Sequence, residues 1–163
     1  MGEERVVIVD EENRVVGSAP RSEMRSRRLW HRAVYVLVEN GAGELFVQRR
    51  VWSKDLYPGH WDVAVSGVVS EGESPEECAI RELAEELGIR GVALEPLATF
   101  RHETEANRVW GSAFRCRWDG PVALQKSEIV EGGWRSLAAI RAMRGREPFT
   151  PESTGLLAGP WLS

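Results

Sequence analysis

The sequence predicts an α/β fold in which a mixed β-sheet is flanked by helices. Short runs rich in β-branched residues recur along the chain and are interrupted by segments of helical character, the clearest of them at residues 75–87. The 163 residues suffice for one domain with a full core, whereas two domains would be cramped. We therefore expect a single domain over residues 1–163, with 1–28 as an N-terminal hairpin extension and 29–163 as the core.

The amino-terminal half is predicted to consist mainly of strands. The runs expected as strands are Arg5–Val9, Arg14–Ser18, His31–Val38, Glu44–Arg50 and Trp61–Val65. The first two are joined by a polar turn, so they form a hairpin, and the basic run Ser22–Arg28 is compatible with a short helix. The segment Gly67–Glu73 is a glycine-bounded loop leading out of the last strand, and glycine there lets backbone approach a metal or phosphate closely.

The helix after this loop has a marked start and a marked end. Ser74-Pro75-Glu76-Glu77 is a capping box with proline at the first helical position, and Gly88 stands where helices usually stop. At about 100° per residue, one side of the helix carries acids and the other carries apolar residues. The residues expected on the core side are Ile80, Leu83, Ala84 and Leu87.

The carboxyl-terminal half adds three strands and two helices. The expected strands are Val92–Glu103, Arg108–Trp118 and Glu128–Arg135. The first two form an antiparallel pair, with Asp119-Gly120-Pro121 as the closing turn. Ser136–Arg144 has helical character, and Thr150-Pro151-Glu152 can start a last short helix.

Three acids on the helix indicate a metal site. Glu82, Glu85 and Glu86 are spaced i, i+3 and i+4, so they crowd one face and repel one another. A hard divalent cation relieves this repulsion, because carboxylate oxygens are the ligands that Mg²⁺ and Mn²⁺ prefer. Magnesium keeps positions open for phosphate oxygens, so the cluster suggests phosphate chemistry. An acidic, solvated helix paired through Arg81 is the alternative.

This segment resembles the signature of the Nudix hydrolase superfamily at every defining position. The pattern is Gly67, five residues, Glu73, seven residues, and then Arg81-Glu82-Leu83, Glu85-Glu86 and Gly88-Ile89. The resemblance implies the Nudix α/β/α sandwich with a mixed sheet. It also implies a Mg²⁺- or Mn²⁺-dependent hydrolase of acid anhydrides in phosphorus-containing compounds, in which metal-activated water attacks phosphorus. It leaves the substrate open, because one fold and its metal site serve many substrates.

The resemblance also assigns roles within the signature. Glu82, Glu85 and Glu86 should hold one or more divalent ions, with the Gly67 carbonyl as a further ligand. One glutamate would accept a proton from the bound water, with Glu82 as the first candidate and Glu85 as the second. Glu73 and Arg81 are expected to form a structural pair that ties the loop to the helix.

Outside the signature, three more residues are candidates for the site. Family members supply an additional carboxylate from a late loop, which suggests Glu128, with Glu131 as the other option. Arg50 and Lys54 resemble phosphate-contacting residues of related members, and only one of Arg49 and Arg50 can face the site, because neighbours on a strand point to opposite faces. Among the aromatic residues, Trp30, Trp52 and Trp61 flank the expected cleft and are candidates for stacking on a base, but core packing is the first expectation for any one of them.

Composition excludes several classes of protein. The chain is 42% hydrophobic and 28% charged with a formal net charge of −4, so it has no basic field that would collect nucleic acid. No apolar run approaches a membrane span, and the first residues lack signal-peptide character. Two cysteines and three histidines form no spaced metal set. We expect a cytoplasmic protein with a small-molecule diphosphate as its partner; homodimers are common in the family.

Two other functions remain as alternatives. From His31 to Gly67 the chain also resembles the type I isopentenyl-diphosphate isomerases, but the positions of their catalytic cysteine and metal-binding histidine hold Ser66 and Val68. A non-catalytic nucleotide sensor is the other alternative, although none of the signature acids is missing. The expectation is therefore hydrolysis of a diphosphate bond in a nucleoside diphosphate linked to another moiety.

Overall fold

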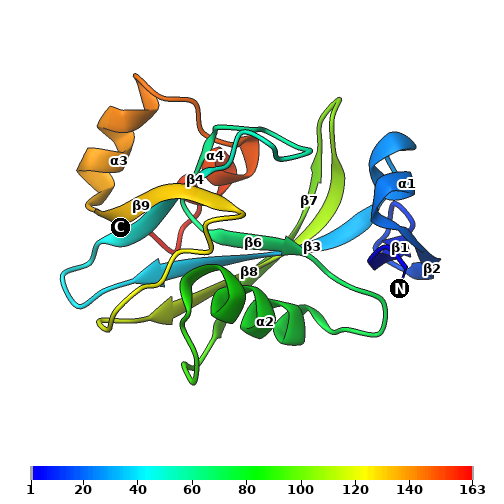
Figure 1. The fold of residues 1–163 in the computed structure, drawn as a ribbon, viewed down its shortest axis with the longest axis horizontal. Coiled ribbons are helices and arrows are strands. Elements are labelled where there is room, and N and C mark those ends of the chain that lie inside the picture. Colours follow the sequence, from blue (N-terminus) through cyan, green and yellow to red (C-terminus); the bar gives the residue numbers. More distant parts are fainter. Residues whose placement is uncertain (1, 163) are drawn as a thin grey trace.

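The amino-terminal hairpin is present in the computed structural model, which describes residues 2–162 (Figure 1). Strands β1 (Arg5–Val9) and β2 (Val15–Pro20) pair antiparallel and are followed directly by helix α1 (Arg21–Ser26). Strand β1 also binds the loop that precedes α2 (Pro75–Leu87), because the Val7 nitrogen donates to the Val69 carbonyl at 3.1 Å. The extension is therefore attached to the part of the chain that carries the signature.

Strand β3 (His31–Glu39) is the centre of a mixed sheet. It runs parallel to β8 (Arg108–Arg117) and antiparallel to β6 (Val65–Val68), and β7 (Glu95–Glu103) pairs antiparallel with β8. Strand β4 (Leu45–Arg50) meets β3 only at their turn. It then diverges to pair with β5 (Trp61–Asp62) and β9 (Ile129–Arg135). This divergence opens space between the two parts of the sheet.

Alternation along β3 divides the core into two layers. Val34, Val36 and Val38 pack in the cluster that contains the buried face of α2. Their neighbours Ala33, Tyr35 and Leu37 pack in a second cluster with residues of α3 (Leu137–Arg144) and α4 (Pro151–Leu157). Figure 1 shows α2 on one side of the sheet and α3 and α4 on the other. The predicted α/β class, the flanked mixed sheet and the amino-terminal hairpin are confirmed.

The start and end of α2 are as predicted, whereas its buried face is not. Ser74 accepts from the Glu77 nitrogen, the Glu77 side chain accepts from the Ser74 nitrogen, and Gly88 closes the helix in the left-handed conformation. The prediction that Ile80 and Ala84 face the core was wrong, because Ile80 is 53% exposed and Ala84 is only half-buried. The buried residues of α2 are Cys78, Ala79, Leu83, Glu86 and Leu87.

Three further expectations about the strands were wrong. Trp61–Val65 is not one strand, since β5 pairs with β4 while β6 pairs with β3. Gly67 lies inside β6 and not in the loop that follows. The turn Asp119-Gly120-Pro121 does not close the β7–β8 pair, which is joined by residues 104–107; it starts a segment that returns to α2, where the Gln125 nitrogen donates to the Glu86 carbonyl at 2.9 Å. Pairing with distant strands decided each case, and such pairing leaves no local signal.

No helix within residues 2–162 is long and apolar enough to cross a membrane.

Candidate active site

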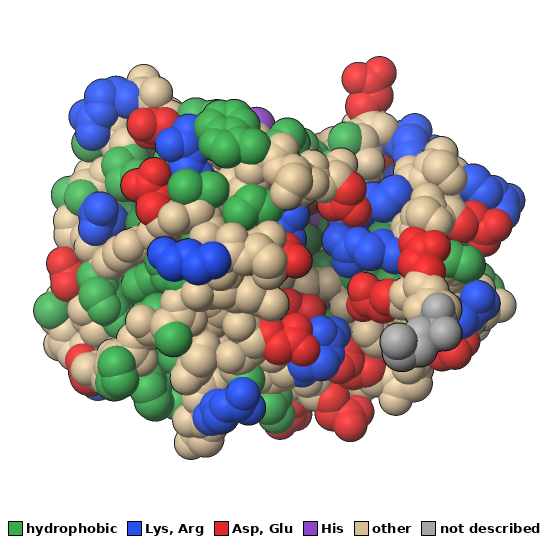
Figure 2. All heavy atoms as spheres, in the orientation of Figure 1, with side chains coloured by type: hydrophobic (Ala, Val, Ile, Leu, Met, Phe, Trp, Pro, Cys, Tyr) green, Lys and Arg blue, Asp and Glu red, His purple; other side chains and the backbone are tan. Residues whose placement is uncertain are grey.

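A cleft of about 540 Å³ opens where the two parts of the sheet diverge. Its walls come from α2, α1, the β4–β5 loop and the segment that ends at Glu128. In Figure 2 the surface is hollowed near the centre of the face shown, with acidic side chains below the hollow and basic ones beside it. Six of the predicted site residues with functional side chains line this cleft: Arg50, Lys54, Glu82, Glu85, Glu86 and Glu128.

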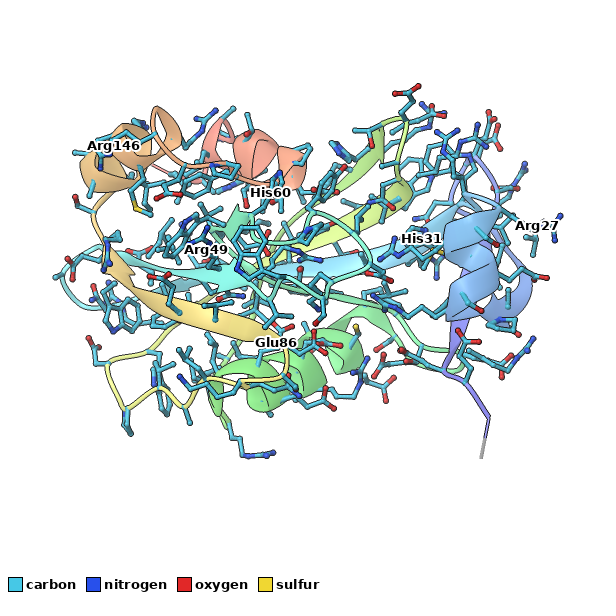
Figure 3. All side chains as sticks on the ribbon, turned by 45° about the horizontal axis from the view of Figure 1, so that its top comes forward. Arg27, His31, Arg49, His60, Glu86 and Arg146 are labelled. Carbon is cyan, nitrogen blue, oxygen red and sulfur yellow. The ribbon has the colours of Figure 1, made fainter. Side chains whose placement is uncertain are left out.

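Glu86 lies deepest among the acids of α2. It is 7% exposed, and within residues 2–162 its carboxylate accepts no hydrogen bond and has no ion-pair partner. Figure 3 shows its side chain on the side of α2 that faces the sheet. Burial raises the pKa of Glu86 well above its ordinary value, and the nearby Glu82 raises it further. A buried carboxylate without a partner is costly, so this position favours a cation.

Glu82 faces the cleft one turn earlier. Its side chain is 14% exposed and accepts a hydrogen bond from Arg81 at 2.8 Å. Burial raises the pKa of Glu82 to about 7, against the opposing effect of Arg81. Glu85 is more open, with a side chain that is 48% exposed and 3.4 Å from Arg81. The Gly67 backbone packs directly against Glu82, where a methyl group would overlap the carboxyl group.

Glu73 and Arg81 form a two-pronged pair. The Arg81 Nε and Nη2 donate to the two oxygens of Glu73 at 2.7 and 2.9 Å. The hydrogen bond from Arg81 lowers the pKa of Glu73. Glu73 also accepts from the Ser70 nitrogen at 3.1 Å, so the pair connects the loop to the helix. Arg81 lines the cleft, whereas Glu73 does not.

The opposite wall carries Glu128 and Lys54, which form an ion pair. Glu131, the other acid considered for this role, does not line the cleft and pairs with Arg49 at 3.5 Å. Of these two acids, Glu128 lines the cleft and Glu131 does not.

Arg49 and Arg50 point to opposite faces of β4. Arg50 lines the cleft, where it donates to Asp62 at 3.1 Å and to the Leu56 carbonyl at 3.0 Å. Arg49 lies over the ring of Trp52 outside the cleft. Both predicted phosphate contacts are engaged by an acid, Arg50 by Asp62 and Lys54 by Glu128.

None of the three tryptophans suggested for stacking lines the cleft. Trp30 and Trp61 are buried, at 7% and 5% exposure, and Trp52 is 67% exposed on the outer side of the β4–β5 loop. The aromatic residues on the wall are Tyr35 and Tyr57. Core packing, the first expectation for each, is confirmed for Trp30 and Trp61 and wrong for Trp52.

Several polar residues of the cleft were not foreseen from the sequence. The Asn107 side chain donates to Glu152 at 3.1 Å, and Thr150 donates to Asp62 at 2.7 Å, so these four form a polar floor. Arg21 and Arg25 of α1 line the far end. Their spacing of four residues on a basic helix was the one available signal, because it places both on the same face.

Cys78 and the histidines take no part in a ready-made metal cluster. Among residues 2–162, no three His, Cys, Asp or Glu side chains are gathered closely enough to hold an ion as they stand. Cys78 is buried, and burial raises the pKa of its thiol. Glu82 is paired with Arg81 and Glu128 with Lys54, so these two carboxylates point to basic residues and not to a common centre.

His31 lines the cleft as a buried neutral side chain. It is 2% exposed with Nδ1 3.0 Å from the Leu29 carbonyl, and burial lowers its pKa to about 4, against the effect of that hydrogen bond. The His31 side chain is therefore protonated at a higher pH in the unfolded chain than in the folded protein. The free energy of unfolding falls as the pH drops from about 6.5 to about 4. We expect the stability difference between wild type and His31→Asn to shrink by about 2–3 kcal/mol from pH 7 to about pH 4.5.

Urea unfolding of both proteins at the two pH values measures this difference. Subtracting the variant removes the contribution of the other titrating groups. A difference that stays constant with pH would show that His31 is not held neutral.

Comparisons with known proteins cover almost the whole chain. A family model described as the NUDIX domain matches residues 29–153. An uncharacterised Nudix hydrolase of Yersinia pestis is 46% identical over 160 residues, which cover 98% of this chain and 86% of the relative. The uncharacterised Nudix hydrolase YfcD of Escherichia coli K12 is 44% identical over 155 residues, covering 95% and 85%. The crystal structure of DR0079 from Deinococcus radiodurans has a TM-score of 0.82 at 29% identity, covering 94% of this chain and 97% of that one.

Proposed function

The chain belongs to the Nudix family of hydrolases, enzymes that act on pyrophosphate bonds, and we propose that it cleaves the diphosphate bond of a nucleoside diphosphate linked to another moiety. The observation that carries this proposal is the buried, unpartnered carboxylate of Glu86 beside Glu82 at one end of the cleft. Such a carboxylate is suited to a divalent cation; Lys54, a basic residue whose charge acts on it, is itself paired with Glu128.

The residues present fit Mg²⁺ or Mn²⁺. Glu82, Glu85 and Glu86 would hold the ion together with the Gly67 carbonyl, and Glu128 would join them from the opposite wall. All of these ligands are oxygens, the donor type that both ions prefer. When bound, such an ion neutralises phosphate charge and acidifies a coordinated water molecule. The release of Glu82 from Arg81 and of Glu128 from Lys54 would accompany binding.

The chain's own groups would then divide the remaining work. We assign proton acceptance to Glu82, because a carboxylate whose pKa is raised to about 7 is matched to a base at neutral pH, with Glu85 as the second candidate. Lys54, once free of Glu128, would contact the diphosphate as a point charge. Arg50 would add a fixed positive charge beside it. Glu73 and Arg81 would hold the loop against the helix without contacting substrate.

The isomerase alternative draws no support from the cleft. Ser66 and Val68 stand at the positions where a thiol and an imidazole would be needed, and both line the cleft. A serine hydroxyl is a poor acid or base for that chemistry, and valine cannot bind a metal. The sensor alternative is addressed by experiment.

A substrate screen tests the proposal. We expect hydrolysis of the diphosphate bond in one class among sugar-linked nucleoside diphosphates, dinucleotides, nucleoside triphosphates and isopentenyl diphosphate, with Mg²⁺ or Mn²⁺ and not in EDTA. The two phosphorylated products are separated and identified by chromatography. Products formed in ¹⁸O-water and analysed by mass spectrometry would carry the label on phosphorus. Tight binding of a nucleotide without turnover would instead indicate a sensor, and rearrangement of isopentenyl diphosphate an isomerase.

A further inference from the structure

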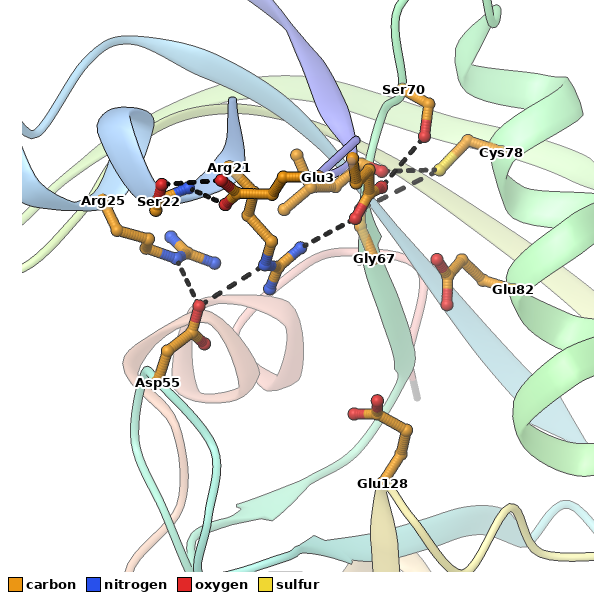
Figure 4. A network of polar contacts seen from close by, with 12 residues as sticks. Glu3, Arg21, Ser22, Arg25, Asp55, Gly67, Ser70, Cys78, Glu82 and Glu128 are labelled. Atoms are coloured by element: carbon orange, nitrogen blue, oxygen red, sulfur yellow. Dashed lines mark hydrogen bonds and ion pairs between the residues drawn. The ribbon is translucent and has the colours of Figure 1, made fainter. Parts of the chain in front are cut away.

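Two arginines of α1 converge on one carboxylate oxygen at the far end of the cleft. Arg25 Nε and Arg21 Nε lie 3.2 and 3.4 Å from the same Oδ2 of Asp55, which belongs to the β4–β5 loop. Figure 4 shows this group on one side of the cleft, with Glu82 and Glu128 on another. The guanidinium groups thus lie away from the acids proposed to hold the metal.

The helix that carries these arginines is firmly held although it precedes the segment matched by the family model. Glu3 accepts hydrogen bonds from the Ser22 nitrogen and hydroxyl at 2.6 and 2.9 Å. The Glu4 carbonyl accepts from the Arg21 nitrogen at 2.9 Å. Strand β1 is bound to the loop before α2, so Arg21 and Arg25 are held in a fixed position relative to α2. The family match begins only at residue 29, so these arginines lie outside it.

The two arginines are paired with Asp55 and, through Arg21 Nη1 at 3.9 Å, with Glu4, and these contacts leave hydrogen-bonding capacity unused. Charge-assisted N–H···O bonds are usually about 2.7–2.9 Å long, and both contacts here are longer and share one acceptor. Arg25 makes one more bond, to Asn107 at 3.2 Å, and its Nη2 donates to no residue of 2–162. The Arg25 side chain is 17% exposed, whereas Asp55 is 40% exposed. A carboxylate so placed is displaced more easily than the arginines are.

We propose that this end of the cleft is a second anion subsite, which binds a phosphate monoester carried by the substrate in addition to its diphosphate. Arg21 and Arg25 bind the phosphate, and Asp55 gives way to it. A phosphate monoester carries a charge of about −1.5 to −2 at neutral pH, which matches two guanidinium groups, whereas a carboxylate matches one. This assignment rests on the proposed function, because the diphosphate must lie at the other end.

Burial supports the assignment in a second way. Burial lowers the pKa of Arg25, and the positive charges of Arg21 and Arg50 lower it further, against the effect of Asp55. Asp55 therefore does not fully compensate the positive charge of the Arg25 guanidinium at this position. A dianion would compensate it more fully than Asp55 does.

The subsite is tested first without metal and without turnover. In EDTA, calorimetry should detect binding of inorganic phosphate to the wild-type protein. We expect Arg25→Gln and Arg21→Gln each to weaken it at least about tenfold, while Arg27→Gln stays within about twofold. Arg27 is the matched control because it ends the same helix, its side chain is 65% exposed, and it points outward (Figure 3). Equal affinities in all three variants would overturn the proposal, with any residual binding that of an adventitious ion.

A gain in phosphate affinity distinguishes the subsite from a purely structural ion pair. Asp55→Asn removes the competing charge, so phosphate should bind several-fold more tightly than in wild type. If the ion pair only fixes the β4–β5 loop, Asp55→Asn should have lower thermal stability and no gain in phosphate affinity. That result would count against the subsite. This variant also keeps the test decisive if Arg25→Gln folds poorly.

Matched substrate pairs then test the subsite during turnover. Coenzyme A and its 3′-dephospho form, and NADPH and NADH, each share a diphosphate and differ by one phosphate monoester. We expect kcat/KM to favour the phosphorylated member by at least about tenfold, and Arg25→Gln to abolish that preference. Equal losses on both members would place Arg25 on the shared diphosphate and overturn the subsite. No hydrolysis of any diphosphate would contradict the proposed function, and phosphate binding in EDTA would still decide the subsite.

Discussion

Glu86→Gln is expected to abolish metal-dependent hydrolysis and at the same time to stabilise the metal-free protein. The carboxylate is buried without a hydrogen-bond or ion-pair partner, so its charge has a cost that the more distant Lys54 offsets in part and that a bound cation would relieve. A neutral amide of the same shape removes that cost and with it the cation. Metal ions contribute several kcal/mol to transition-state stabilisation in such reactions, so kcat should fall by at least about 10³-fold.

The stability gain has a defined dependence on pH. The pKa of Glu86 is raised in the folded state, so the folded protein holds the proton more tightly than the unfolded chain. Glu86 therefore does not lower the free energy of unfolding at a pH where it is protonated in both states. It lowers that free energy progressively more as the pH rises. We expect the gain for Glu86→Gln to be absent near pH 4 and to reach about 1–3 kcal/mol near pH 8.

Chemical unfolding in EDTA and in Mg²⁺ measures both halves of this expectation. Mg²⁺ should raise the unfolding midpoint of the wild type and leave that of Glu86→Gln unchanged. Glu76→Gln is the matched control, since Glu76 lies on the exposed first turn of the same helix and should behave as wild type. A variant that is inactive and also less stable in EDTA would show that Glu86 has a structural partner.

Local signals account for what the sequence predicted well. The capping box at Ser74 and the left-handed Gly88 fix the ends of α2 within a few residues of chain, and the pattern of acids between them fixes which side chains can share a site. The alternation of β4 was enough to place Arg49 and Arg50 on opposite faces. Each of these inferences depends only on neighbours in sequence.

Long-range packing accounts for what the sequence could not show. Ile80 is exposed because β3 and β6 pack against the side of α2 that carries Cys78, Leu83 and Leu87, so the acidic face adjoins the core instead of opposing it. The meeting of Arg21 and Arg25 with Asp55 joins positions about thirty residues apart. No helical or strand period carries that information, because it arises only when the amino-terminal hairpin folds against the loop before α2.

Gly67→Ala is expected to remove most activity with little loss of stability. The glycine is not needed for its backbone conformation, since its φ is not positive; it is needed because a Cβ there would overlap the carboxyl group of Glu82. The flexible Glu82 side chain can move aside, so the cost in stability should stay at or below about 1 kcal/mol. The displaced carboxylate can then serve neither metal nor water, and an error of about 1 Å in a reacting group costs about 10²-fold in kcat.

Metal affinity and activity together locate the effect of this substitution. Glu82 should lose its place while Glu86 keeps its own, so Gly67→Ala should bind Mg²⁺ more weakly than wild type but still be stabilised by it, unlike Glu86→Gln. Gly155→Ala in α4 is the control, because a Cβ at that position meets no atom within 4 Å. Full activity in Gly67→Ala would mean that Glu82 can leave the Gly67 backbone without cost to the chemistry. Proton acceptance would then pass to Glu85, the second candidate for the base.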